Sequence, residues 1–514
     1  MFIEPNTVIR ILRNCPLDTT YEHTIYFTSE SGQVSYFQGL TKYTLTQQSY
    51  QRVKRGYMRV AIQAESLYDC NYLMFQNSSF GNKWFYAFIK SVEYVNNVTS
   101  EIEFEIDVMQ TWFFNYTLGM CFVEREHAMN DNIGANTVPE NLEFGEYVAD
   151  DFDGTNILGS KSIVVASTFT GEDLKNISGT VYSGIYSGAY YNVFPNTTAG
   201  AIAVNELLQR VSDKGKTDGI ISVFLMPTAM IGEQLESARS YEISKTKNTT
   251  SIGGYIPKNK KLFTYPYNFL YVTNLQGNSG AFPYEFFSGD SCTFGMSGDF
   301  TCNPGVVLYP TNYKGVPANF DEKMVLTGWP QCTYNTDVFK AWLAQNSASM
   351  GVSTIGGALG TGARAMMAAS VAGPVGAGAI AVGAGISIAT NVANTLAQVY
   401  EKSIMPRQSH GSLGGTTLAA VGLLDFAFMH KHIKPEFAEI IDNYFSMYGY
   451  ATHKVKIPNR SGRPYWNYVK TAGAAITGSV PADDMAKIVS IYDRGITFWK
   501  SGANVGKYNL DNSI

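Results

Sequence analysis

The segment from Ala341 to Tyr400 constrains the chain most, because it is long, apolar and almost free of charge. Its single charged residue is Arg364, and no aromatic residue lies between Trp342 and Tyr400. Gly, Ala, Val, Ile and Ser fill most of the interval. Crossing a bilayer takes about 20 predominantly apolar residues, so the segment is long enough for two crossings.

Pro374 divides this segment into two apolar arms, 352–373 and 375–400. The simplest geometry is a hairpin that turns near Pro374 and has aromatic residues at its base, where they favour a membrane interface. Gly356 and Gly360 have the G-x-x-x-G spacing that lets membrane helices approach closely. We expect a loop that inserts into a membrane under certain conditions, marked by Trp342, Gly356, Gly360, Arg364, Met366, Val371, Pro374, Val375, Ile380, Val382, Ile386, Ile388 and Tyr400.

Three other structures remain open for this segment. A buried or oligomer-packed hairpin is the first, although each of about ten glycines costs about 1 kcal/mol relative to Ala in a helix interior. A permanent membrane anchor is the second, although the arms are poor in Leu and one contains Arg364. A dinucleotide-binding loop is the third, because residues 376–381 fit G-x-G-x-x-A. That fingerprint requires a preceding strand and a βαβ unit, and Gly373 and Pro374 break the stretch before it.

The composition favours β-rich domains with extensive subunit contacts. Only 16% of the 514 residues are charged, whereas Tyr (33) and Phe (30) are plentiful. The net charge of −5 argues against tight DNA binding, because phosphate contacts require many Lys and Arg side chains. A surface past which DNA slides remains compatible with this charge.

The cysteines are few and widely spaced, and none forms a C-x-x-C pair. We therefore expect buried free thiols of a reducing compartment rather than a disulfide framework. The residues concerned are Cys15, Cys70, Cys121, Cys292, Cys302 and Cys332.

The clearest strand signal is the alternation over residues 101–108. Ile102, Phe104, Ile106 and Val108 fall on one face, and acidic residues fall on the other. Such alternation predicts a half-buried strand. An ordinary solvated face is one interpretation of the acidic row. The alternative is that the row lines something that must repel polyanions, and its members are Glu101, Glu103, Glu105 and Asp107.

The sequence predicts a mainly β chain with added helices and five segments. We expect a first β domain over 1–125, a mixed α/β domain over 126–260, a second β domain over 261–342 that continues over 416–470, an apolar loop over 343–415, and a C-terminal helix and tail over 471–514. The spacing Asp-Val-x-x-x-Trp at 107–112 recurs at 337–342, which suggests a duplicated β domain.

Two helices are predicted after the apolar loop. The first begins at Pro435, carries the stripe Phe437, Ile440, Ile441 and Tyr444, and ends at Gly449. The second begins near Pro481 and ends at Gly495, with the stripe Met485, Ile488, Val489 and Tyr492. Short strands are expected at 24–28, 57–62, 219–226, 269–273, 284–287 and 306–309, and short helices at 203–211 and 230–235.

Enzyme motifs are weak in this chain. Gly215-Lys216-Thr217 ends like a P-loop, but Arg210 occupies the position of its first glycine. Glu124-x-x-His127 supplies half of a carboxylate metal site without a second copy. The His430-Lys-His432 spacing suits a metal, but we expect a solvated turn there. We therefore predict no catalytic site, no metal and no cofactor.

Several runs of sequence resemble the tail knob, or distal tail tube, proteins of short-tailed phages of the phi-29 type. They occur in the expected order over most of the chain, and they are 102–112 (IEFEIDVMQTW), 122–142 (FVEREHAMNDNIGANTVPENL), 308–315 (LYPTNYKG), 463–471 (RPYWNYVKT) and 495–500 (GITFWK).

The resemblance implies a homo-hexameric ring at the end of a virion tail, with β-barrel-like tube domains around a channel for double-stranded DNA. It also implies a long hydrophobic loop, here about 345–415, that plugs the channel and later forms a pore in the host membrane. The implied partners are the other tail proteins, including the proximal tube or collar and the tail tip, passing DNA bound without sequence specificity, and host membrane lipids. The protein would be assembled in the host cytoplasm.

Two other functions stay open from the residues alone. One is a receptor-binding or adhesive tail protein whose apolar segment is buried in an oligomer interface. The other is an enzyme that acts on the cell wall, which the scarcity of His, with six in the chain, disfavours.

Overall fold

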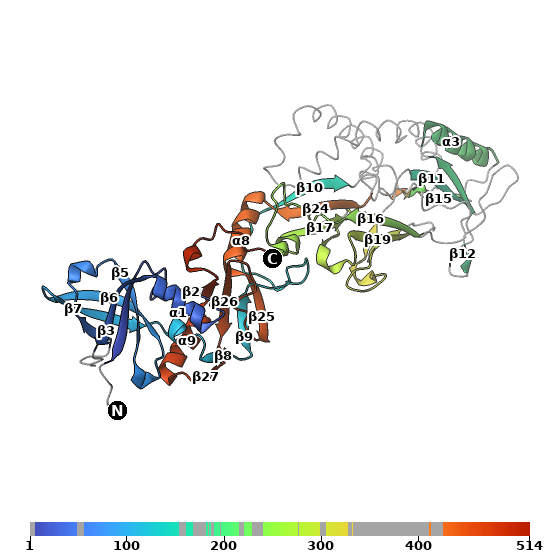
Figure 1. The fold of residues 1–514 in the computed structure, drawn as a ribbon. Coiled ribbons are helices and arrows are strands. Elements are labelled where there is room, and N and C mark those ends of the chain that lie inside the picture. The colour runs from blue at the N-terminus through green and yellow to red at the C-terminus, as the bar shows by residue number, and fades with distance from the viewer. Residues whose placement is uncertain are drawn as a thin grey trace. The chain divides into compact units, whose positions relative to one another are not determined.

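A computed structural model gives the fold of the chain (Figure 1). It describes residues 6–48, 56–153, 161–167, 181–182, 185–186, 190–195, 197–214, 220–228, 240–275, 277–298, 305–326, 331–332, 411–412 and 425–514. The predicted fold class, mainly β with added helices, is confirmed.

The chain divides into two compact units, each made of separate stretches of sequence. Unit 1 comprises Met1–Glu143, Pro257–Lys261 and Glu439–Ile514, and unit 2 comprises Phe144–Ile256 and Leu262–Ala438. These units differ from the segments expected from the sequence, because the C-terminal residues join the N-terminal β domain instead of forming a separate tail.

Unit 1 contains a six-stranded antiparallel sheet in the order β3-β1-β5-β6-β7-β4 (Figure 1). Its strands are β1 Thr7–Arg13, β3 Thr41–Gln48, β4 Tyr57–Val60, β5 Cys70–Gln76, β6 Phe85–Asn96 and β7 Thr99–Ile106. Ser100, Ile102 and Phe104 of β7 are buried and alternate with half-buried residues, so the predicted alternation is confirmed within the strand.

A second sheet of unit 1 joins both ends of the chain, in the order β2-β28-β26-β9-β25. Its strands are β2 His23–Ile25, β9 Cys121–Glu126, β25 Tyr450–Lys456, β26 Trp466–Ala472 and β28 Ile496–Trp499, and β2 runs parallel to β28. A small sheet pairs β8 Tyr116–Leu118 with β27 Ile476–Gly478. Because the pairing partners are so distant in sequence, the C-terminal strands are an integral part of this unit.

The helices of unit 1 close its larger core. They are α1 Glu30–Gly39, α2 Val108–Thr111 and α9 Ala482–Arg494. The helix α8 Pro435–Tyr448 contributes its residues from Glu439 onward. Short 3₁₀ turns are η1 Ala64–Ser66, η2 Ser78–Phe80 and η8 Gly502–Asn504, and η5 spans Lys260–Phe263. Phe37 of α1 stacks on Tyr72 of β5 with ring centroids 5.2 Å apart, and Ile488 and Tyr492 of α9 belong to the same core.

Both predicted C-terminal helices are confirmed, with one correction to their stripes. Gly449 follows α8 at a φ of 64°, and Gly495 follows α9 at a φ of 99°, a backbone region that favours glycine. Of the α9 stripe, Ile488, Val489 and Tyr492 lie in or against the core as predicted. The α8 stripe is wrong at Ile440, which is 64% exposed, because Ala438, Ile441 and Phe445 form the buried side of that helix.

Unit 2 consists of several antiparallel sheets around one core. The first has the order β10-β24-β17-β18, with β10 Tyr147–Asp153, β24 Ala427–Ile433, β17 Asn268–Thr273 and β18 Ser279–Pro283.

The second sheet of unit 2 has the order β16-β19-β20-β21, with β16 Ser240–Thr246, β19 Ser291–Gly298, β20 Val306–Thr311 and β21 Met324–Leu326. The third has the order β14-β11-β15-β22-β23, with β14 Tyr190–Pro195, β11 Lys161–Ser167, β15 Ile220–Pro227, β22 Gln331–Cys332 and β23 Gly411–Ser412. β12 Val181–Tyr182 pairs with β13 Ile185–Tyr186, and the helical pieces are α3 Thr198–Asp213, η6 Tyr284–Phe286 and η7 Phe320–Glu322.

Two local predictions in unit 2 are wrong. Residues Tyr284–Phe286 form a 3₁₀ turn instead of a strand. His430 and His432 lie in strand β24 instead of a solvated turn, and His432 is buried with its Nε2 atom 2.8 Å from Asp150 Oδ1. For the two histidines, the pairing of β24 with the distant strands β10 and β17 overrides the local pattern.

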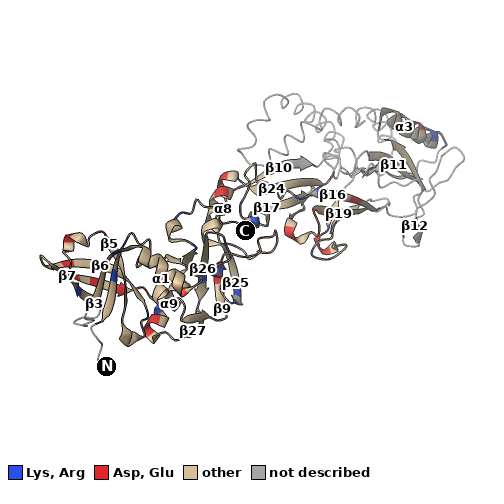
Figure 2. Ribbon diagram, viewed as in Figure 1, with Lys and Arg blue, Asp and Glu red and all other residues tan. Residues whose placement is uncertain are grey.

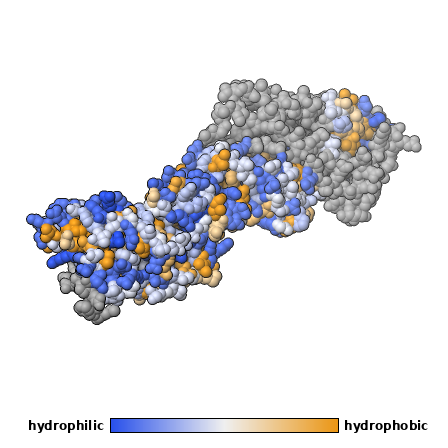
Figure 3. Space-filling view, in the orientation of Figure 1, coloured by the Kyte–Doolittle hydropathy of each residue, from blue (hydrophilic) through white to orange (hydrophobic). Residues whose placement is uncertain are grey.

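The four cysteines whose side chains the structure describes are buried free thiols, as predicted. Burial raises the pKa of Cys15 and of Cys292 to about 12, so these thiols are poor nucleophiles. On the face drawn in Figure 3, hydrophobic residues form small groups among hydrophilic ones, which is the usual pattern of a protein surface.

Candidate functional site

The acidic row predicted from the sequence lies on β7, and three of its four members are solvent-accessible. The side chains of Glu101, Glu103 and Glu105 are 26%, 31% and 36% exposed. They alternate with buried residues of β7, so they share one face of the sheet.

Basic side chains accompany these glutamates. Arg59 Nε donates to Glu101 Oε2 at 2.8 Å, and Lys90 Nζ lies 3.9 Å from Glu103 and 4.0 Å from Glu105. Lys487 of α9 adds a contact of 3.4 Å to Glu105. Figure 2 shows acidic and basic residues close together on these strands. These cations offset much of the charge of the row, which is therefore less negative than the sequence suggested.

Asp107 does not continue this exposed row. Its side chain is buried, because the chain turns from β7 into α2 at this residue. The carboxylate accepts from Gln110 N at 3.0 Å and from the Tyr72 hydroxyl at 2.8 Å. Burial raises the pKa of Asp107 to about 6, against these hydrogen bonds. Asp107 is a helix cap, and its predicted place on the acidic face is corrected.

The predicted membrane loop lies outside the described residues, and so do all of its marker residues: Trp342, Gly356, Gly360, Arg364, Met366, Val371, Pro374, Val375, Ile380, Val382, Ile386, Ile388 and Tyr400. Among the residues that the structure describes, no helix has the length and apolar character needed to cross a membrane. The described strands on either side of this part of the chain pair with each other, because Gln331 of β22 is opposite Ser412 of β23.

The run 122–142, which carries much of the family resemblance, contains a buried ionic cluster around Glu140. Both terminal guanidinium nitrogens of Arg125 donate to Glu140 Oε2 at 2.6 Å. The other oxygen, Oε1, accepts from Lys261 Nζ at 2.5 Å and from Ala451 N at 2.8 Å. Glu140 and Lys261 are each 3% exposed, so this carboxylate joins three distant stretches of unit 1 inside the protein.

Glu126, the last residue of β9, and His127 after it form further buried polar contacts in unit 1. Glu126, 3% exposed, forms an ion pair with Lys456 and accepts from Asn459 N at 3.1 Å. His127 Nδ1 accepts from Tyr468 N at 2.7 Å, which leaves Nε2 to donate to Ser446 O at 3.0 Å. The ring is thus held as one neutral tautomer. Burial and the nearby Arg463 lower the pKa of His127 to about 3.

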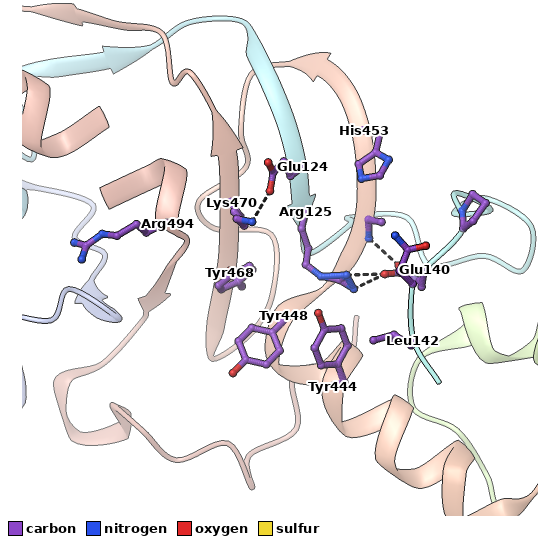
Figure 4. Close-up of a pocket in the computed structure, with 13 residues that line it drawn as sticks. Glu124, Arg125, Glu140, Leu142, Tyr444, Tyr448, His453, Tyr468, Lys470 and Arg494 are labelled. Atoms are coloured by element: carbon purple, nitrogen blue, oxygen red, sulfur yellow. Dashed lines mark hydrogen bonds and ion pairs between the residues drawn. The ribbon is translucent and has the colours of Figure 1, made fainter. Parts of the chain in front are cut away.

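An open pocket of about 500 Å³ adjoins this network in unit 1 (Figure 4). Tyr444 and Tyr448 of α8 and Tyr468 of β26 form its aromatic side, and Figure 4 shows the ring of Tyr444 close to Arg125 and Leu142. Glu124 and Lys470 pair at 2.6 Å on its polar side. The remaining lining residues are Pro139, Glu140, Asn141, Ala451, His453 and Arg494. No local sequence pattern indicates this pocket, because only the tertiary fold brings these segments together.

The Glu124-x-x-His127 and His430-x-His432 spacings do not produce a metal site. Within the described ranges, no group of three or more His, Cys, Asp or Glu side chains could hold a metal ion. Glu124 pairs with Lys470 instead, and His127 and His432 are occupied by the contacts described above.

Comparison with known proteins identifies the family. A model of the C-terminal domain of tail knob protein gp9 from Bacillus phage phi29 matches residues 233–513, more than half of the chain. The chain belongs to the phi29-type tail knob protein family. A model of the N-terminus of caudoviral major tail proteins also matches, over residues 5–117.

Full-length relatives and a solved structure agree with this tail knob assignment. The chain is 26% identical to tail knob protein gp9 of Bacillus phage PZA and 25% identical to that of phi29, covering 99% of this chain and 98% of each relative. The structure of the bacteriophage C1 tail knob protein gp12 matches with a TM-score of 0.67 at 14% identity, over 99% of this chain and 100% of that one. The protein is therefore a structural tail knob protein and a virion component, and the resemblance found in the sequence is confirmed.

Proposed function

We propose that this tail knob protein forms the distal DNA-conducting tube of a short phage tail, as a closed homo-hexameric ring that contacts other tail proteins. The match of residues 5–117 to the N-terminus of a major tail protein supports this proposal most, because it covers all six strands of the six-stranded sheet of unit 1. A ring needs a heterologous contact that repeats until it closes.

The exposed face of β7 suits the wall of the channel. DNA is held by Lys and Arg side chains that neutralise its phosphates. Basic side chains from three neighbouring elements lie beside Glu101, Glu103 and Glu105 of β7: Arg59 of β4, Lys90 of β6 and Lys487 of α9. Each cation is thus close to a protein carboxylate, which weakens its attraction for phosphate and favours sliding over binding.

We further propose that the apolar segment first plugs the channel and then forms a pore in the host membrane. The pairing of β22 with β23 supports an insertion that leaves one sheet of unit 2 and returns to it. An apolar segment of this length must be sheltered in the free virion, since soluble proteins rarely expose large apolar patches. Arg364 would face the water-filled pore.

The channel assignment is tested by converting Glu101, Glu103 and Glu105 to Lys. We expect rings that assemble normally but eject DNA more slowly or not at all. The matched control converts Glu143, Glu439 and Asp511 to Lys, because these exposed acids of unit 1 lie outside the six-stranded sheet that contains β7 and the change in charge is the same. Equal ejection by the two variants would show that β7 lies away from the DNA path.

The membrane assignment is tested by dye release from liposomes. The full chain should release a small dye under at least one triggering condition, and a variant without residues 350–400 should form rings and release nothing. Arg364→Glu should alter the ion selectivity of the pore in planar bilayers. Equal leakage by the deletion variant would refute the role of the apolar segment.

A further inference from the structure

The pocket in Figure 4 is built from rigid parts and still offers free hydrogen-bonding groups. The Arg125 guanidinium is fixed by Glu140 on one side and lies 4.7 Å from the ring centroid of Tyr444 on the other. Tyr444 packs against Tyr448 with centroids 5.0 Å apart, and Tyr448 meets Tyr468 edge-on at 5.3 Å. The aromatic side is therefore held in place before any ligand arrives, which lowers the entropic cost of binding.

Four of the five charged side chains that line the pocket form ion pairs, and the fifth, Arg494, points away from the other lining residues (Figure 4). Arg125 is matched by Glu140, and Lys470 by Glu124. A strongly anionic ligand would have to break these pairs, and the buried Glu140 would oppose it. A purely apolar ligand would cover the Glu124–Lys470 pair without replacing its contacts with water, which is costly. The lining therefore favours a ligand without net charge that is rich in groups able both to donate and to accept.

Hydroxyl groups have this dual character. One hydroxyl can donate to Glu124 while a second accepts from Lys470, and Asn141 and His453 add exposed amide and imidazole groups at the rim. Flat aromatic rings beside polar groups match a ligand with one apolar and one polar face. Sugar rings combine C–H faces with a rim of hydroxyls. The volume of about 500 Å³ lies within the usual range of small-ligand sites.

We propose that this tyrosine pocket binds a neutral saccharide unit, such as a sugar of a bacterial surface glycan. Tyr444, Tyr448 and Tyr468 form the stacking side, and Glu124, Lys470 and Asn141 hold the hydroxyls. The site lies within unit 1 and does not depend on the channel or on the membrane loop. It would give the tail knob a contact with the cell surface in addition to its structural role.

The test uses the full chain on an array of neutral, amino-sugar and anionic bacterial glycans, followed by calorimetric titration of the best neutral oligosaccharide. We expect saturable binding that weakens about tenfold or more in Tyr448→Ala. Asn141→Ala should also weaken binding, and because Asn141 is exposed this variant guards against misfolding. The control is Tyr68→Ala, since Tyr68 is an exposed tyrosine of unit 1 outside the pocket, and it should bind normally.

Three results would overturn the proposal. The first is the absence of binding to any neutral saccharide at about 10 mM, which is weaker than ordinary recognition. The second is unchanged affinity in both Tyr448→Ala and Asn141→Ala. The third is competition by inorganic phosphate as effective as that by the sugar, which would indicate a simple anion site. These experiments measure glycan binding, whereas the tests of the proposed tube and pore measure DNA ejection and dye release. A negative result for the pocket would therefore leave the proposed tube and pore unaffected.

Discussion

Unit 1 contains two sets of glutamates with similar chemistry and different surroundings. Glu101, Glu103 and Glu105 on β7 are 26–36% exposed and lie beside cations at the surface. Glu126 and Glu140 are each 3% exposed and lie inside a network that joins β9, β25 and residues distant in sequence. Exposed ion pairs contribute little to stability, whereas removal of one partner of a buried pair leaves an uncompensated charge. The buried set maintains the fold, and the exposed set is free to serve function.

The largest effect should come from Glu140→Ala. Arg125 and Lys261 would lose their shared carboxylate inside the protein, and we expect the free energy of unfolding to fall by about 3–5 kcal/mol. Urea unfolding measures this change. The matched variant Glu103→Ala should change stability by less than about 1 kcal/mol. Similar losses in the two variants would contradict the distinction between the two sets.

A smaller effect should appear as a pH dependence that originates at His127. Its pKa is about 3 in the folded state and 6.5 when unperturbed, so the unfolded chain takes up a proton first as the pH falls. The burial of neutral His127 therefore adds to the free energy of unfolding in full above pH 6.5. This addition is lost as the pH falls toward 3, because protonation then favours the unfolded chain. Between pH 7 and pH 4, the wild-type chain should lose about 3 kcal/mol relative to His127→Gln. Parallel stability curves for the two proteins over this range would show that His127 is not buried in its neutral form.

Gly449 connects α8 to β25 and lies against β9, where its replacement is a purely steric test. A Cβ atom there would lie 2.2 Å from Glu126 O, and the φ of 64° already favours glycine. Gly473 has a similar φ of 69°, but a Cβ there would meet nothing within 4 Å. Gly449→Ala should therefore lower the free energy of unfolding by about 2 kcal/mol more than Gly473→Ala does, as measured by thermal or urea unfolding. Equal costs would mean that the contact with Glu126 is loose.

The smallest effect should come from Arg59→Ala on the exposed row. The ion pair of Arg59 with Glu101 lies at the surface, so the free energy of unfolding should change by about 0.5 kcal/mol or less. The same variant makes the face of β7 more negative, and DNA ejection should proceed at least as fast as in the wild type. A loss of several kcal/mol would place this row among the structural ion pairs.

Elements with a strong local signal were predictable from the sequence. The alternation of β7, the stripe and glycine end of α9, and the buried thiols all follow from residue spacing and composition. Asp107 was assigned to the wrong face because the alternation of apolar and acidic residues in the sequence continues past the end of β7. In the structure, the chain turns at Asp107 into a helix that this residue caps.

The ionic network and the pocket were beyond local analysis. Lys261 and Glu140 are separated by 121 residues, and Lys456 and Glu126 by 330. Likewise, Tyr448 and Tyr468 approach only because α8 and β26 pack in the same unit. The periodicity of a helix or a strand reveals which residues share a face, but it does not reveal contacts between residues that are distant in sequence.

The most direct test of the central claim is a cryo-electron microscopy map of the assembled ring with the structure of unit 1 fitted into it. The account predicts sixfold symmetry, with the exposed face of β7 carrying Glu101, Glu103 and Glu105 on the wall of the central channel. A map in which this face lies on the outer surface of the ring, or in which the assembly has no axial channel, would contradict it.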